Sequence, residues 1–234
     1  MLNAFYYDSM SAKDLCIQMQ SPVTFSGVQP KEKTISVPGR NGDLHSSEHA
    51  YANKTAEAIC FVLQENVQQV LDQIVKWTLL NPGYKRLELE DDPEYYHMAR
   101  VTNGPEIQIR MKLLAPFTIR FDCKPQKFRK DGEYPRIFSE PSVLYNGAFP
   151  SLPLITVYGS GEGELQIGRY TVKLLSIDES LTLDSDTQNA YKETQNKNNT
   201  VFAPQFPRLE PGENEIAWQG GIQKIKIIPR WWTL

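Results

Sequence analysis

The stretch of the sequence that decides the fold reads Asn146-Gly-Ala-Phe-Pro-Ser-Leu-Pro-Leu-Ile-Thr-Val-Tyr-Gly-Ser-Gly-Glu-Gly-Glu-Leu-Gln-Ile-Gly-Arg-Tyr-Thr-Val-Lys-Leu-Leu-Ser-Ile-Asp-Glu-Ser-Leu-Thr-Leu-Asp184. Glycines divide it into four apolar or alternating runs, 154–158, 164–167, 170–175 and 181–184. In the second run Leu165 and Ile167 share one face, which is the period of a half-buried strand. The stretch therefore predicts four short strands of an antiparallel sandwich or barrel.

Two dipeptides that contain glycine predict how these strands are connected. Gly168-Arg169 suits a two-residue hairpin, because glycine in the first loop position adopts the positive φ of a type II′ turn. Further along, Asn214–Gln219 is typical of a strand, and Gly220-Gly221 predicts a hairpin into a last strand, Ile222–Ile228. The C-terminal part of the chain, residues 131–234, is thus expected to be a β-sandwich.

The preceding residues, 1–130, predict an α+β domain of antiparallel sheets with one helix. Val67, Val70, Leu71, Ile74, Val75 and Thr78 recur at the 3.6-residue period of a helix face. Asn66 and Gln69 resemble a capping box, and Asn81-Pro82-Gly83 ends the helix. The predicted strands are 4–7, 15–19, 23–28, 34–37, 56–63, 86–89, 95–101, 106–113 and 117–123, and we expect the domain boundary near Lys127–Tyr134.

Composition and charge exclude several classes of protein. Apolar residues make up 40% of the 234 residues, enough to bury a substantial core. The net charge of −3 disfavours a dedicated nucleic-acid binder. Met1–Met10 has neither a cationic start nor an apolar core, so we expect no secretory signal, and no run is long enough to span a bilayer. Cys16, Cys60 and Cys123 are expected to be buried free thiols.

One long segment does not fit the compact domain. Residues 39–54 follow the turn-forming Pro38-Gly39-Arg40-Asn41-Gly42-Asp43-Leu44 and show no apolar period. Because such a segment has little to bury within its own domain, it predicts a long loop or an extended arm that packs on a neighbouring subunit. Residues 38–44 are our candidates for an oligomer interface.

Several motifs suggest chemistry but lack its context. His45-Ser46-Ser47-Glu48-His49 matches the H-x-x-E-H pattern of zinc proteases, which requires a helix that this segment does not predict. The acidic run 90–94 lacks the alternating ligands of a calcium loop, and the basic residues of 124–130 are interpreted as a solvated tether rather than a phosphate track. No nucleophile elbow, phosphate loop or dinucleotide fingerprint is present. We predict no enzyme, no metal and no cofactor.

Several turn motifs, taken in order, resemble the siphophage distal tail protein (Dit) family. They are Pro38–Asp43, Asp91–Tyr96 leading into Ala99-Arg100-Val101, Phe117-x-Ile-x-Phe121-x-Cys-x-Pro125, Asn146-Gly147, Pro211–Ile216 and Ile-x-Pro229-Arg230-Trp231. Each motif is weak alone, because it is mostly turn chemistry, and their order across nearly the whole chain carries the resemblance.

The resemblance implies a structural protein of the virion tail tip, or baseplate, made in the host cytoplasm. Its N-terminal domain would form a homohexameric ring between the tail tube protein and the tail-associated tip protein. Its C-terminal domain would be a galectin-like sandwich to which receptor-binding or other baseplate proteins attach for host attachment. Genomic DNA would pass through without specific binding, since six copies of a −3 chain carry −18. The family implies no membrane association.

A carbohydrate-binding β-sandwich protein is the alternative from another functional class. Trp231 and Trp232 could stack on a sugar ring, although one of them could equally close the sandwich core, where large aromatic side chains bury most area. A fold of this kind hosts many functions and identifies none by itself. The two hypotheses differ in whether glycan binding depends on these tryptophans.

Overall fold

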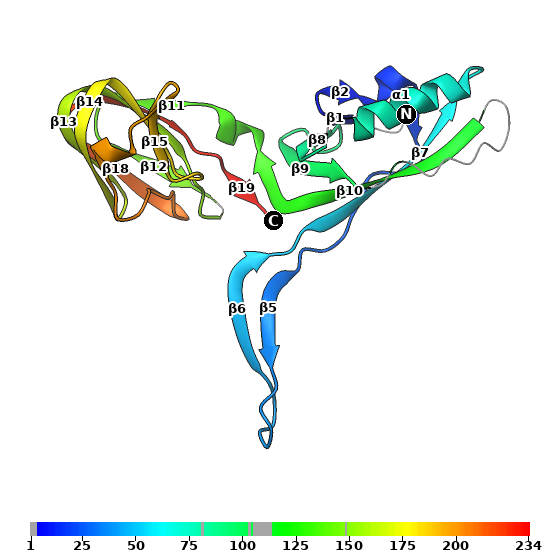
Figure 1. Cartoon of the computed structure of the whole chain (residues 1–234), viewed down its shortest axis with the longest axis horizontal. Coiled ribbons are helices and arrows are strands. Elements are labelled where there is room, and N and C mark those ends of the chain that lie inside the picture. Colours follow the sequence, from blue (N-terminus) through cyan, green and yellow to red (C-terminus); the bar gives the residue numbers. More distant parts are fainter. Residues whose placement is uncertain (1–3, 81, 103, 105–113, 148) are drawn as a thin grey trace. The chain divides into compact units, whose positions relative to one another are not determined.

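The protein is mainly β, with antiparallel sheets and one α-helix among the residues that the structure describes. This computed structural model describes residues 4–80, 82–102, 104, 114–147 and 149–234. The chain divides into two compact units, one of residues 1–127 with Leu234 and one of residues 128–233. Figure 1 labels helix α1 and strands of both units.

The first unit is built on one large antiparallel sheet. Its strands run in the order β2-β1-β8-β9-β10-β7-β3, and β4 pairs with β7. Strands β5 and β6 form a separate two-stranded sheet. The elements are β1 (Phe5–Tyr7), β2 (Met10–Ser11), η1 (Ala12–Leu15), β3 (Ile17–Met19), β4 (Thr24–Phe25), β5 (Pro30–Ile35), β6 (Leu44–Tyr51), β7 (Lys54–Leu63), α1 (Val67–Leu79), β8 (Lys85–Leu89), β9 (Tyr95–Val101) and β10 (Leu114–Arg129).

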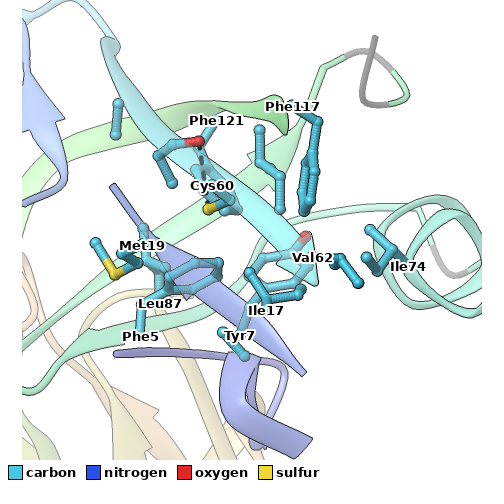
Figure 2. Packing of buried hydrophobic residues seen from close by; sticks show 14 of the residues in the cluster. Phe5, Tyr7, Ile17, Met19, Cys60, Val62, Ile74, Leu87, Phe117 and Phe121 are labelled. Carbon is cyan, nitrogen blue, oxygen red and sulfur yellow. Dashed lines mark hydrogen bonds between the residues drawn. The ribbon is translucent and has the colours of Figure 1, made fainter. Parts of the chain in front are cut away.

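The core of the first unit lies between this sheet and α1. Along β7 buried and exposed residues alternate strictly from Lys54 to Cys60, as a strand with one buried face requires. Figure 2 shows the aromatic and aliphatic side chains that meet there. Trp77 of α1 stacks on Phe5 with ring centroids 5.9 Å apart, and its Nε1–H donates to the Tyr7 carbonyl at 3.0 Å. The helix is thereby attached to β1.

The helix confirms the predicted period, with two corrections. Val67, Leu71, Ile74 and Thr78 are buried, but Val75 is 38% exposed. The predicted capping box is wrong, because the Asn66 side chain makes no capping hydrogen bond. A capping box does occur at the short helix η1, where Ser11 and Asp14 bond each other's backbone N–H.

The second unit is built on one eight-stranded antiparallel sheet. Its order is β11-β18-β13-β14-β15-β16, with β12 paired to β18 and β17 to β14. The elements after β10 are η2 (Lys130–Glu133), β11 (Arg136–Phe138), β12 (Ser142–Asn146), β13 (Leu154–Ile167), β14 (Tyr170–Asp184), β15 (Asn189–Lys192), β16 (Gln195–Asn196), η3 (Asn198–Thr200), β17 (Val201–Phe202), β18 (Gly212–Ile228) and β19 (Trp232–Thr233).

The predicted four short strands are two long ones. The Gly168-Arg169 hairpin is confirmed, with Gly168 at φ 51°, but residues 159–163 lie inside β13, where the register with β14 shifts between Gly161 and Gly163. The predicted hairpin at Gly220-Gly221 is wrong, because strand β18 continues through these two residues. A Cβ at Gly221 would overlap the Ser160 carbonyl oxygen. These glycines therefore let β13 and β18 approach closely where their register shifts.

The core of the second unit is formed by the inward faces of these long strands. Ile155, Leu165, Leu183 and Ile227 are all fully buried within one cluster. At one end of the sheet Arg230 donates to Asp184 at 2.6 Å, and this hydrogen bond lowers the pKa of the Asp184 carboxyl although burial opposes the shift. The second unit is thus stabilised by apolar packing and by a partly buried ion pair.

The segment between the two predicted domains differs from the expected tether. Strand β10 was predicted to end at Cys123 but continues to Arg129, and η2 follows it directly. The predicted strand 106–113 lies outside the described residues. Among the described helices none has the length and apolar character needed to span a bilayer.

Candidate functional site

The exposed two-stranded ribbon of β5 and β6, residues 30–51, is the main candidate site, and we call it the arm. Every residue of β5 is exposed, and no residue of β6 is buried. The two strands pair from Pro30 with Tyr51 to Ile35 with Leu44, and they belong to no other sheet. The arm has the hydrogen bonds of a strand pair without the apolar burial that stabilises one.

The base of the arm is fixed to the first unit by backbone hydrogen bonds. Ala52 donates to the Gln29 carbonyl at 2.8 Å, and Ser26 donates to the Thr55 carbonyl at 2.9 Å. These bonds continue the ribbon into the region where β4 pairs with β7. The arm is therefore a hairpin that starts from the main sheet, as Figure 1 shows for β5, β6 and β7.

The tip of the arm contains all the predicted interface residues. Residues 38–44 are exposed, and Gly39 and Gly42 adopt φ of 79° and 81°. Only glycine reaches this left-handed region without a steric penalty, so the turn chemistry noted in the sequence has a conformational cause. Ile35 and Leu44, the last paired residues before the tip, are 43% and 39% exposed. That these residues contact another subunit remains a prediction.

The H-x-x-E-H motif lies on a strand of the arm. His45 and His49 belong to β6 and therefore do not share a helical face, as the protease geometry requires. His45 Nδ1 instead lies 3.4 Å from the Thr34 hydroxyl of the paired strand. The strand conformation removes the basis of the zinc hypothesis.

Charged residues of segments 90–94 and 124–130 form ion pairs within the first unit. Lys13 Nζ donates to Glu90 at 2.6 Å, and this hydrogen bond, together with one from the Ala4 N–H, lowers the pKa of Glu90. Asp92 pairs with Lys127, whose ammonium also lies 4.1 Å from the Tyr95 ring. The interpretation of 124–130 as a solvated tether is therefore wrong for Lys127, which is paired.

The two tryptophans differ in environment. Trp231 is only 8% exposed and packs in the core of the second unit, with the guanidinium of Arg129 5.3 Å from its ring. Trp232 is half-buried, stacks on Phe149 at 4.7 Å and donates from Nε1 to the Pro150 carbonyl at 3.0 Å. The geometry leaves Trp232 as the one of the pair with accessible ring surface.

Buried titratable groups occur in the first unit outside the arm. His97 is 5% exposed, and burial together with Lys54 and Lys127 lowers its pKa to about 4, so it is neutral at pH 7. Burial raises the pKa of the Cys60 and Cys123 thiols to about 12, which makes them unreactive. Cys16 was predicted to be buried but is exposed, because it ends η1 with φ 55° and turns outward there.

Comparison with known proteins gives a structural similarity and no sequence match. No protein-family model and no curated protein matches the chain. The crystal structure of the SPP1 Dit protein (gp 19.1), described as a paradigm of the hub adsorption apparatus in phages that infect Gram-positive bacteria, matches with a TM-score of 0.77. The identity is 11%, and the match covers 97% of this chain and 98% of that one. The two chains share a fold along their whole length.

Proposed function

We propose that this protein is a structural, non-enzymatic hub subunit of a phage tail tip. The observation that carries the proposal is the fold similarity to the SPP1 Dit protein, which covers nearly the whole of both chains. A shared superfold alone would say little about function. A match that includes both units in the same chain, together with the turn motifs recognised in the sequence, favours a common role in a tail adsorption apparatus.

In the proposed assembly, residues 1–130 form a homohexameric ring and residues 131–234 form a galectin-like domain on its outside. The ring connects the tail tube protein to the tail-associated tip protein and leaves a channel for DNA. Receptor-binding or other baseplate proteins attach to the outer domain. The site of the mature protein is the virion tail tip.

The arm is the proposed contact between neighbouring ring subunits. Of residues 31–50, only Val37 and Ala50 are even half-buried, so the rest of the arm gives no apolar surface to its own unit. A lone two-stranded hairpin is marginally stable in water. Packing against a second copy of the chain would supply the missing burial and would cover residues 38–44.

The mass of the purified full chain in solution tests the proposal. Light scattering or native mass spectrometry over a range of concentrations is expected to show a six-subunit species. A monomer at every concentration would contradict self-assembly of the ring by this chain alone, and a different subunit number would contradict the hexamer.

A matched deletion tests the arm separately. Pro30 and Tyr51 are paired across the ribbon, so residues 31–50 can be replaced by a two-residue Asn-Gly turn without moving the base. We expect this variant to fold as a monomer, because no buried side chain is lost, and to form no ring. Rings that persist in a folded deletion variant would refute the role of the arm.

A further inference from the structure

A polar cleft in the second unit has the features of a ligand site. It has a volume of about 550 Å³, within the range of roughly 300–1,000 Å³ that is usual for small-molecule sites. It lies beside the start of β14, the residues that follow β14 and the segment before β18. Among its lining residues, Arg169, Ser185, Asp186, Gln205, Phe206 and Arg208 define its chemistry.

Ser185 provides the first indication of a ligand. It is 2% exposed, and its hydroxyl has no hydrogen-bond partner among the described residues. Its backbone N–H is satisfied by the Pro153 carbonyl at 3.1 Å, whereas the side-chain hydroxyl is not. Buried polar groups are nearly always bonded, because an unpaired one is destabilising. The hydroxyl oxygen is itself covered, so a ligand in the cleft would bond to it only after the Ser185 side chain turns toward the cleft.

The two arginines of the cleft are in different states. Arg169 donates to Glu210 at 2.9 Å and to the Tyr170 hydroxyl at 3.0 Å, and Tyr170 in turn donates to Glu210 at 2.6 Å. These bonds hold the Arg169 guanidinium in place. Arg208 is exposed and forms no ion pair with any described residue. One wall is thus fixed by the protein, while the Arg208 donors remain available.

The charges of the cleft favour a neutral ligand. The charge of Arg169 is compensated by Glu210. The guanidinium of Arg208 and the carboxylate of Asp186 have opposite charges in the same lining, and neither forms an ion pair with a described residue. A site for phosphate or carboxylate would be expected to present a surplus of positive charge. Here each arginine is offset by one carboxylate, so the site has no such surplus.

A sugar hydroxyl meets these requirements, since it both donates and accepts hydrogen bonds. Arg208 and the Gln205 amide supply donors, Asp186 and Ser185 supply acceptors, and the half-buried Phe206 adds an aromatic surface. We propose that this cleft binds a neutral saccharide of one or two sugar rings. This site is separate from Trp231 and Trp232, and it does not depend on the assembly proposed above.

Saturation-transfer NMR on the full chain tests the proposal with a defined panel. The probes are glucose, galactose, mannose, N-acetylglucosamine, lactose and maltose, with glycerol 3-phosphate as the charged probe. We expect at least one neutral sugar to bind with a dissociation constant of about 1 mM or lower. Arg208→Ala should weaken that binding about tenfold or more, because it removes a charged hydrogen-bond donor.

Two further variants distinguish a ligand site from a structural role. Ser185→Ala should weaken sugar binding without lowering the melting temperature, since the hydroxyl has no hydrogen-bond partner among the described residues. Arg136→Ala, an exposed arginine of the same unit outside the cleft, should bind as the parent does.

Three outcomes would overturn the assignment. They are the absence of transfer to every sugar of the panel, tighter binding of glycerol 3-phosphate than of any sugar, and unchanged binding in Arg208→Ala. Loss of binding in Trp232→Ala with full binding in Arg208→Ala would move the sugar site to the tryptophan. A monomeric mass in solution would contradict self-assembly of the ring by this chain alone, and it would leave the sugar-binding test unaffected.

Discussion

The arm and the β13–β14 hairpin are both long antiparallel strand pairs, and they differ in what covers their faces. β13 and β14 pair from Leu154 with Asp184 to Ile167 with Tyr170, and fully buried residues such as Leu165 and Leu183 line their inner face. The arm has a similar ladder of backbone bonds, but no residue of β5 or β6 is buried.

The difference shows which interaction decides whether a hairpin is stable alone. A backbone hydrogen bond exchanges one with water and contributes only about 1 kcal/mol net. Burying a large apolar side chain contributes about 1.5–3 kcal/mol. The β13–β14 hairpin has both terms within its own unit, whereas the arm has only the first. We therefore expect substitutions of the same kind to have unequal effects in the two regions.

The largest effect is expected from truncating a leucine in each hairpin. Leu165→Ala should lower the free energy of unfolding by about 2–5 kcal/mol, because Leu165 is fully buried and its removal leaves a cavity. Leu44→Ala, at a residue 39% exposed in the arm, should change it by less than about 0.5 kcal/mol. Urea denaturation of the monomer followed by circular dichroism measures both. Equal losses would mean that the arm is buried in the monomer.

The next largest effect is expected in the pH dependence of stability, from the buried His97 of the first unit. The pKa of His97 is about 4 in the folded protein against 6.5 for the ordinary group, so the unfolded chain binds the proton first as pH falls. The folded state should therefore lose about 3 kcal/mol relative to the unfolded state between pH 6.5 and pH 4.

His97→Gln should flatten this part of the pH profile, because it removes the buried group whose pKa is lowered. The comparison with the parent is needed because the Asp122 and Asp184 carboxyls also have pKa values lowered from 3.8. The unfolded chain protonates them first, so they too destabilise the folded state at the acid end of this range. A profile for His97→Gln with the parent's slope would show that His97 is already protonated or exposed in the folded state.

The smallest effect is expected from glycine substitutions in the two regions. Gly221→Ala should destabilise the second unit by about 1–3 kcal/mol, because its Cβ would overlap the Ser160 carbonyl oxygen. Gly42→Ala has open space around it and strains only the φ of 81°. Its strain of about 1–2 kcal/mol stays within the arm. The melting temperature should not change, while amide hydrogen exchange in residues 32–47 should accelerate severalfold. A lowered melting temperature in Gly42→Ala would show that the arm unfolds together with its unit.

Sequence periodicity predicted the elements whose burial pattern is local. The strands at 56–63 and 95–101, the helix face from Val67 to Thr78 and the turn at Gly168-Arg169 can each be recognised within a few neighbouring residues. The absence of an apolar period in residues 39–54 predicted a long loop or an extended arm, and the structure has a strand with no buried residue there, β6.

Long-range contacts account for the predictions that were wrong. The glycines at 159–163 and 220–221 were interpreted as strand ends, whereas Gly159 and Gly163 face Gly221 and Gly220 across β13 and β18. A glycine needed for close approach has the same sequence signal as one needed for a turn. The side chain of Asn66 made no cap, and Cys16 was exposed by a left-handed backbone that no local pattern indicated.

The cleft residues carried no signal in the sequence. Arg169, Ser185, Asp186, Gln205 and Arg208 come from three separate segments and match no motif. The three segments have the composition of ordinary polar loops. Only the pairing of β13, β14 and β18 brings these segments to one end of the sheet.

The sequence by itself determined the class of the fold, the position of the helix, the exposed arm and the net charge, because each depends on the composition or period of a continuous segment. The tertiary structure decided that four predicted strands are two long ones, which glycines lie in strands, where Trp231 is buried and which polar residues share the cleft. Those features depend on which distant residues meet, and the free energy of such contacts is absent from any local pattern.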